Sequence, residues 1–155
     1  MSKKWLLILI RATLLVIALC GICICGGLYP FLISLEGFQQ LTSGIAWGQL
    51  IFYWGTSLPC FMILGLCWTV SSSLKAEVFT RRNAFLLNLC ALLLFGDALV
   101  FYLGNFVLML MGRNTFAIVF YLLVIAALAV ALGFGVLAYF IRRGTELREE
   151  NESYV

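Results

Sequence analysis

Residues 84–111 read AFLLNLCALLLFGDALVFYLGNFVLMLM, a long apolar run that holds one charged side chain, Asp97. An α-helix needs about 20 apolar residues to cross a bilayer, and this run is longer than that. Similar apolar runs occupy residues 5–29, 46–70 and 115–141. The sequence therefore predicts four transmembrane helices, one near each of these four ranges.

The composition supports the same class of protein. Hydrophobic residues make up 64% of the 155 residues and charged residues 11%, too few to cover a soluble core. The short alternating segments of a membrane β-barrel do not occur, and the first run is too long for a cleaved signal peptide. We predict an all-α integral membrane four-helix bundle over residues 1–141 and a polar cytoplasmic tail over residues 142–155.

The basic residues set the expected orientation, because Lys and Arg are retained on the cytoplasmic side of short loops. One side of the four predicted helices holds Lys3, Lys4, Lys75, Arg81, Arg82, Arg142, Arg143 and Arg148. Only Arg113 falls opposite. Both termini and residues 71–83 are thus predicted to be cytoplasmic, and residues 30–45 and 112–114 to face outward. This topology, together with anionic lipid heads, accounts for the net charge of +3, so no nucleic-acid binding is predicted.

Asp97 is the first candidate for function, because a carboxylate at bilayer depth is costly unless it faces the bundle interior, a partner or water. Gly104 follows seven residues later, almost directly beneath it, and Asn105 is offset by about 80°. Asp97, Gly104 and Asn105 are expected to border one polar pocket. Three interpretations stay open for Asp97: a structural carboxyl, a ligand, ion or proton site in which Asn105 takes part, and a contact with a partner subunit.

Two further features concern how the helices bend and pack. Pro59, near the centre of the second predicted helix, removes a backbone donor and is interpreted as either a hinge or a static bend. Thr56 and Ser57 are placed to satisfy the freed carbonyl. On the fourth predicted helix, small residues at spacing four serve either packing within the chain or formation of a homo-oligomer. That stripe consists of Ala127, Ala131 and Gly135.

Catalytic and metal chemistry find little support. Cys20 and Cys23 have the Cys-x-x-Cys spacing of thiol oxidoreductases, but the predicted outer loops lack the second cysteine pair that such membrane enzymes use. The remaining cysteines of helices two and three are interpreted as small hydrophobic residues. Histidine is absent, and neither a phosphate-binding loop nor an aspartyl pair occurs. We predict no catalytic residue, no metal and no cofactor.

Two polar boxes resemble a known family. Residues 77–83 read EVFTRRN and residues 143–151 read RGTELREEN. They are similar to the Phe-Thr-x-x-Asn and Gly-x-x-Leu-x-Glu-Glu-Asn boxes of the bacterial domain-of-unknown-function family numbered 2975, and the resemblance covers nearly the whole chain. Only the ending, ESYV at residues 152–155, departs from the family pattern. The resemblance implies a bacterial cytoplasmic membrane protein, often encoded beside small helix-turn-helix regulators.

The two boxes also have a physical interpretation. Thr80 is well placed to cap the third helix, Phe79 to insert at the bilayer boundary and Asn83 to bond back to loop or tail backbone. Glu146, Glu149 and Glu150 are expected either to pair with Arg81, Arg82 or Lys75, or to remain solvated in a frayed tail. The candidate partner contacts are Phe79, Arg81, Arg82, Asn83, Gly144, Leu147, Glu149, Glu150 and Asn151.

The sequence as a whole favours a non-catalytic membrane sensor or regulatory interaction protein. Its expected partners are the lipid bilayer, a cytoplasmic protein such as a small helix-turn-helix regulator, and a second copy of the chain. The first alternative is a small transporter or channel that uses Asp97, with Pro59 as hinge. The second is a membrane thiol oxidoreductase that uses Cys20 and Cys23.

Overall fold

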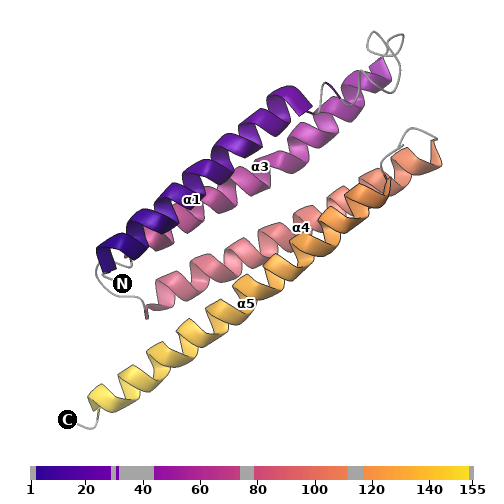
Figure 1. The fold of residues 1–155 in the computed structure, drawn as a ribbon. Helices are drawn as coiled ribbons and strands as arrows, with labels where there is room; N and C mark the ends of the chain where they lie inside the picture. The colour runs from indigo at the N-terminus through magenta and orange to yellow at the C-terminus, as the bar shows by residue number, and fades with distance from the viewer. Residues whose placement is uncertain (1–2, 29–30, 32–43, 74–78, 112–116, 154–155) are drawn as a thin grey trace.

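Four long helices make up the part of the chain that the structure describes, residues 3–28, 31, 44–73, 79–111 and 117–153. It is a computed structural model, drawn as a ribbon in Figure 1. The elements are α1 (Lys3–Cys23), a π-helical turn η1 (Ile24–Leu28), α3 (Gly44–Ser73), α4 (Arg81–Leu110) and α5 (Ala117–Ser153). Lys75, Arg113 and most of the predicted outward joints lie outside the described residues.

Every predicted transmembrane run overlaps one of these helices. The segments long and apolar enough to cross a membrane are Leu7–Gly27, Trp47–Ser73, Arg81–Leu110 and Ile118–Asn151. Their outer surface is apolar, and large side chains such as Leu132 are mostly exposed, as expected where lipid is the solvent. The predicted all-α fold with four membrane-length helices is confirmed. The four membrane-length apolar helices are those expected of a multi-pass membrane protein.

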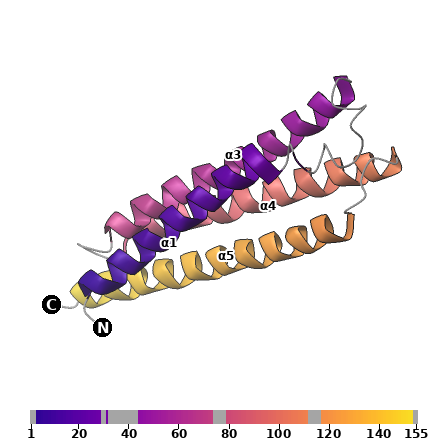
Figure 2. The ribbon, with the colours of Figure 1, turned by 45° about the horizontal axis from the view of Figure 1, so that its top comes forward.

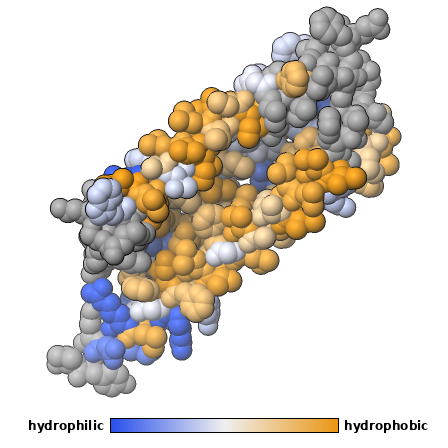
Figure 3. Space-filling model, in the orientation of Figure 1, coloured by the Kyte–Doolittle hydropathy of each residue, from blue (hydrophilic) through white to orange (hydrophobic). Residues whose placement is uncertain are grey.

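Polar residues gather at one end of the molecule. The start of α1 and the end of α5 lie at the same end in both ribbon views (Figures 1 and 2), as four crossings require. In the space-filling view, hydrophobic residues cover most of the visible face and hydrophilic residues collect where α5 ends (Figure 3). We call this the arginine-rich end, because it carries Arg81, Arg82, Arg142, Arg143 and Arg148.

The helices pack in chain order. α1 lies on α3, α3 on α4 and α4 on α5, and the most extensive of these contacts joins α4 to α5. Small buried side chains, Ala84 and Ala98 on α4 with Ala131 and Ala138 on α5, accompany this contact. Small residues let two backbones approach closely in lipid, where no hydrophobic effect drives helices together. Ala131, from the predicted small-residue stripe, thus serves packing within the chain.

The last helix, α5, continues beyond the apolar part of its sequence. α5 runs without a break from Ala117 to Ser153, so the segment we predicted as a polar tail from residue 142 continues the helix. At 1.5 Å per residue, its 37 residues span about 55 Å, well beyond the roughly 30 Å of a hydrocarbon core. The polar end of α5 therefore projects beyond its apolar part as a continuous helix.

Aromatic rings join three helices near the other end of the molecule. Tyr53 of α3 and Phe120 of α5 are buried with ring centroids 5.5 Å apart, and Phe101 of α4 lies 5.6 Å from Phe120. Phe52 stacks on Phe101 at 6.1 Å. Such aromatic pairs contribute about 0.5–1.5 kcal/mol each beyond the area they bury. This aromatic cluster links α3 to α5 across α4.

Gly104 lies directly under this cluster. A methyl group built on Gly104 would overlap the ring of Phe52, whereas a methyl group on Gly96, two turns earlier in α4, would meet nothing within 4 Å. The ring of Phe52 therefore occupies the space that a side chain at position 104 would need.

Replacing Gly104 with alanine is expected to destabilise the protein relative to the same change at Gly96. Both substitutions gain similar helix propensity, since both glycines lie inside α4. Only Gly104→Ala overpacks the cluster, at a cost of roughly 1–3 kcal/mol. Thermal unfolding of the two variants in the same detergent measures the difference. Equal midpoints would contradict the packing of Phe52 on Gly104.

Candidate functional site

Asp97 faces a cavity of about 240 Å³ that is lined by all four helices. α1 and the π-helical turn contribute Gly21 and Cys25, and α5 contributes Val124 and Ala127. The lining is mostly apolar, and within it Asp97 is the only acidic or basic side chain among the described residues. The cavity thus combines an apolar body with one carboxylate.

The Asp97 carboxylate accepts a hydrogen bond from a thiol. Cys60 of α3 donates to Oδ2 of Asp97 with a sulfur-to-oxygen distance of 3.8 Å. A thiol is a weak donor, so this contact leaves most of the hydrogen-bonding capacity of the carboxylate for other groups. Sequence reasoning treated Cys60 as a small hydrophobic residue, because nothing in one sequence indicates that positions 60 and 97 face each other.

The two hydroxyls at the cavity are already engaged inside α3. Thr56 donates to the carbonyls of Phe52 and Tyr53 at 3.2 and 3.1 Å, and Ser57 donates to that of Tyr53 at 2.8 Å. Pro59 lies within α3, which continues through it from Gly44 to Ser73. The carbonyl freed by Pro59 is that of Gly55, so the hydroxyls do not bond it as predicted. The role of Pro59 as a hinge stays a prediction.

Asn105 lies outside the cavity of Asp97. Its side chain is fully buried, accepts a hydrogen bond from the Tyr53 hydroxyl at 3.4 Å and donates to the Phe101 carbonyl at 2.8 Å. Neither Gly104 nor Asn105 lines the cavity of Asp97, contrary to our expectation of one shared polar pocket. Asn105 instead anchors the aromatic cluster, and Asp97 supplies the carboxylate of the cavity.

The cysteine pair of α1 lies away from this carboxylate. Cys20 and Cys23 are exposed free thiols on the surface of α1, and neither lines the cavity. Among the described residues no group of three or more His, Cys, Asp or Glu is placed to hold a metal ion. The thiols near Asp97 are those of Cys60 and Cys25.

At the arginine-rich end, the two polar boxes contact each other. Thr80 caps α4, and its hydroxyl accepts from the Asn83 backbone N–H at 3.2 Å, as predicted. The ring of Phe79 lies against Gly144 of α5 so closely that a methyl group there would come within 2.7 Å of a ring carbon. Asn83, three residues after the cap, is buried, with 1% of its surface exposed. The glycine of the second box thus makes room for the phenylalanine of the first.

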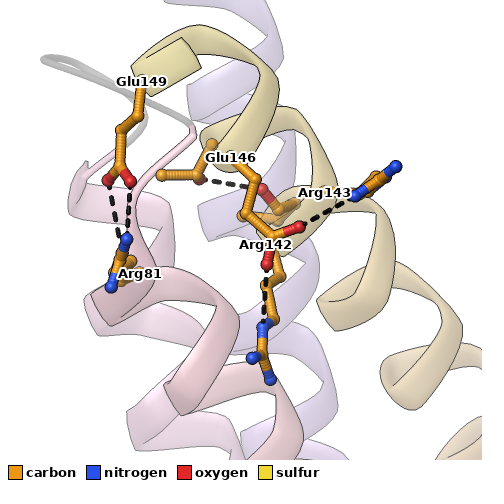
Figure 4. Close-up of polar contacts among 7 residues, drawn as sticks. Arg81, Arg142, Arg143, Glu146 and Glu149 are labelled. Carbon is orange, nitrogen blue, oxygen red and sulfur yellow. Dashed lines mark hydrogen bonds and ion pairs between the residues drawn. The ribbon is translucent and has the colours of Figure 1, made fainter.

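An ion pair reinforces this contact (Figure 4). Arg81 binds both carboxylate oxygens of Glu149, with Nη2 to Oε2 at 2.5 Å and Nε to Oε1 at 3.2 Å. Glu146 pairs with Arg142 and Arg143 of its own helix, at 3.3 and 3.2 Å, and not with the arginines of α4. Neighbours three and four residues apart on a helix are the nearest available partners. One of the predicted cross-helix pairs is therefore present, between Arg81 and Glu149.

Comparison with known proteins found one family. The family described as Protein of unknown function (DUF2975) matches residues 4–155 of this chain. No curated protein and no solved structure matches. The match includes both polar boxes, whose contact the structure describes.

Reversing the charge of Arg81 is expected to loosen the end of α5, and a second reversal at Glu149 to restore it. The pair is exposed, with side chains 76% and 50% accessible, so its contribution to stability is small and the effect is local. Hydrogen exchange of residues 144–153 measures it in Arg81→Glu and in the double variant with Glu149→Arg. Arg82→Glu, on the neighbouring exposed residue, is the control. Equal exchange in Arg81→Glu and Arg82→Glu would argue against the ion pair.

Proposed function

Because this chain belongs to the DUF2975 family, whose function is unknown, we propose a function from its own geometry. We infer a non-catalytic membrane sensor or regulatory interaction protein. A membrane-soluble ligand occupies the cavity of Asp97, and the projecting end of α5 reports its presence to a cytoplasmic protein. The positive-inside pattern of the sequence supports this orientation of the arginine-rich end.

One observation carries the proposal: a single unbroken helix both lines the cavity and forms the projecting end. Leu123, Val124 and Ala127 of α5 line the cavity, and the same helix continues to Ser153. A helix transmits a tilt or rotation along its length, whereas a flexible linker would absorb it. A ligand that changes the packing of α5 on α4 near Asp97 thereby moves the far end of α5.

The chemistry of the cavity indicates the kind of ligand. An apolar lining with one carboxylate fits a molecule that has an apolar body and a single cationic or hydrogen-bond-donating group. Such a molecule partitions into the bilayer before it reaches the site. We propose this class as the signal.

The end of α5 offers a surface for a partner. Leu147 is 51% exposed among charged and polar neighbours, and Glu150 and Asn151 are exposed beside it. An apolar side chain with a polar surround is a common centre for a protein contact. The partner we propose is a small helix-turn-helix regulator, as the family resemblance implies.

Capture of a partner tests the reporting role. We expect crosslinking pull-down of the tagged protein from native membranes to yield a specific cytoplasmic protein, which is lost on truncation after Arg143 and on Leu147→Glu. Arg148→Lys keeps the charge next to that leucine and serves as the control. A partner retained equally by Leu147→Glu and the wild type would place the contact elsewhere on the molecule. Absence of any partner in all samples would contradict the reporting role.

The second candidate function is a small transporter or channel. It is favoured by the presence of a carboxylate in a cavity that all four helices line. The sensor proposal predicts no flux of protons, Na⁺ or K⁺ into proteoliposomes above that of empty vesicles. A flux that is lost in Asp97→Ala but kept in the chain truncated after Arg143 would favour transport and reject the sensor. The truncation separates the two functions because the cavity lies wholly before residue 128.

A further inference from the structure

A second hollow lies between α4 and α5, and it shares no lining residue with the cavity of Asp97. The part of this hollow farther from the arginine-rich end, about 620 Å³, is lined by apolar residues such as Ala91, Phe95 and Leu132. The part at the arginine-rich end, about 450 Å³, is lined by Arg81, Arg142 and Glu146 among others. Both parts share a set of bordering residues and therefore form one groove. These shared residues are Asn88, Gly135 and Tyr139.

The dimensions of the groove match one leaflet of a bilayer. From Arg81 to Phe95, α4 rises by about 21 Å at 1.5 Å per residue. Half of a hydrocarbon core is about 15 Å, and the headgroup region adds several more. Gly135, where a methyl group would meet nothing within 4 Å, keeps the middle of the groove open. The groove thus has its charged mouth at headgroup depth and its apolar part at acyl-chain depth.

The arginines at the mouth of the groove have N–H donors available for an anion. A guanidinium carries five N–H donors, and the observed ion pairs use two on Arg81 and one on Arg142. The side chains of both arginines are about three-quarters exposed, at 76% and 75%. The positive end of the α4 dipole lies beside Arg81 and adds to the potential. Glu146 lines the mouth, and Glu149 pairs with Arg81 from outside the lining. Arg143, the other partner of Glu146, brings the guanidiniums of this group to three against two carboxylates.

We propose that this groove binds one phospholipid with an anionic headgroup, in the leaflet at the arginine-rich end. Its phosphate lies between Arg81 and Arg142, and one acyl chain follows the apolar part toward Phe95. A second copy of the chain fits less well, because a symmetric dimer through this patch would bring the arginines of both copies together. A lipid instead supplies the opposite charge and the apolar chain in one molecule.

Native mass spectrometry of the full chain, extracted after reconstitution with equal amounts of phosphatidylglycerol and phosphatidylcholine, tests the site. We expect phosphatidylglycerol to be retained in preference, and Arg142→Gln to lower its retention about fivefold. Arg143→Gln is the matched control, because Arg143 also pairs with Glu146 but does not line the groove, and Figure 4 shows it pointing away from Arg81. Equal loss in the two variants, or no preference between the lipids, would overturn the proposal.

Two further variants separate the headgroup from the chain. Glu146→Gln removes the carboxylate from the mouth and is expected to raise retention of phosphatidylglycerol. Gly135→Leu fills the middle of the groove and is expected to abolish retention of both lipids. If the wild type is instead a dimer that Gly135→Leu converts to a monomer, the groove is an interface between copies and the lipid proposal is wrong. None of these outcomes bears on the cavity of Asp97, so the sensor proposal stands or falls separately.

Discussion

The structure depends on one constraint: within hydrocarbon, every polar group needs a partner inside the protein. For the backbone, the constraint is met by long helices, in which each N–H bonds the carbonyl four residues earlier. For side chains, it is met pair by pair: Asn105 with Tyr53, and Arg11 with Ser72 and the Trp68 ring. Each pair joins two specific positions, on different helices, whose relative alignment the apolar residues alone would not determine. Polar side chains therefore fix the relative register of helices that apolar contacts would allow to slide.

Asp97 meets the constraint less completely than Asn105 does. Asn105 sits in a fully buried site with a carbonyl acceptor at 2.8 Å and the Tyr53 hydroxyl at 3.4 Å, whereas Asp97 has a weak thiol donor and an open cavity in front of it. A purely structural carboxyl would be expected to have partners of the quality that Asn105 has. The free space beside Asp97 therefore favours a ligand over a structural role.

Features that depend on one segment of the sequence were predicted, whereas contacts between helices were not. Helix number followed from hydropathy, and the Thr80 cap from residue type, since both act within one segment. The continuation of α5 was missed because the prediction ended with hydropathy, although the glutamate, leucine and arginine of residues 146–150 are good helix formers. The Cys60–Asp97 contact and the separation of Asn105 from Asp97 depend on which helices adjoin and on how Phe52 and Tyr53 fill the space between them. One sequence carries no direct signal for either.

The order in which the helices pack determines which wall of the Asp97 cavity yields most readily. α4 and α5 share the most extensive contact, tied further by Phe79 on Gly144 and by the Arg81–Glu149 pair. α1 packs on α3 alone, and most of its large apolar side chains are exposed. Since lipid solvates an apolar helix as well as protein does, separating α1 costs little hydrophobic free energy. For a ligand of the proposed kind, a path from the bilayer past α1 would therefore disturb the structure least and leave the α4–α5 contact intact.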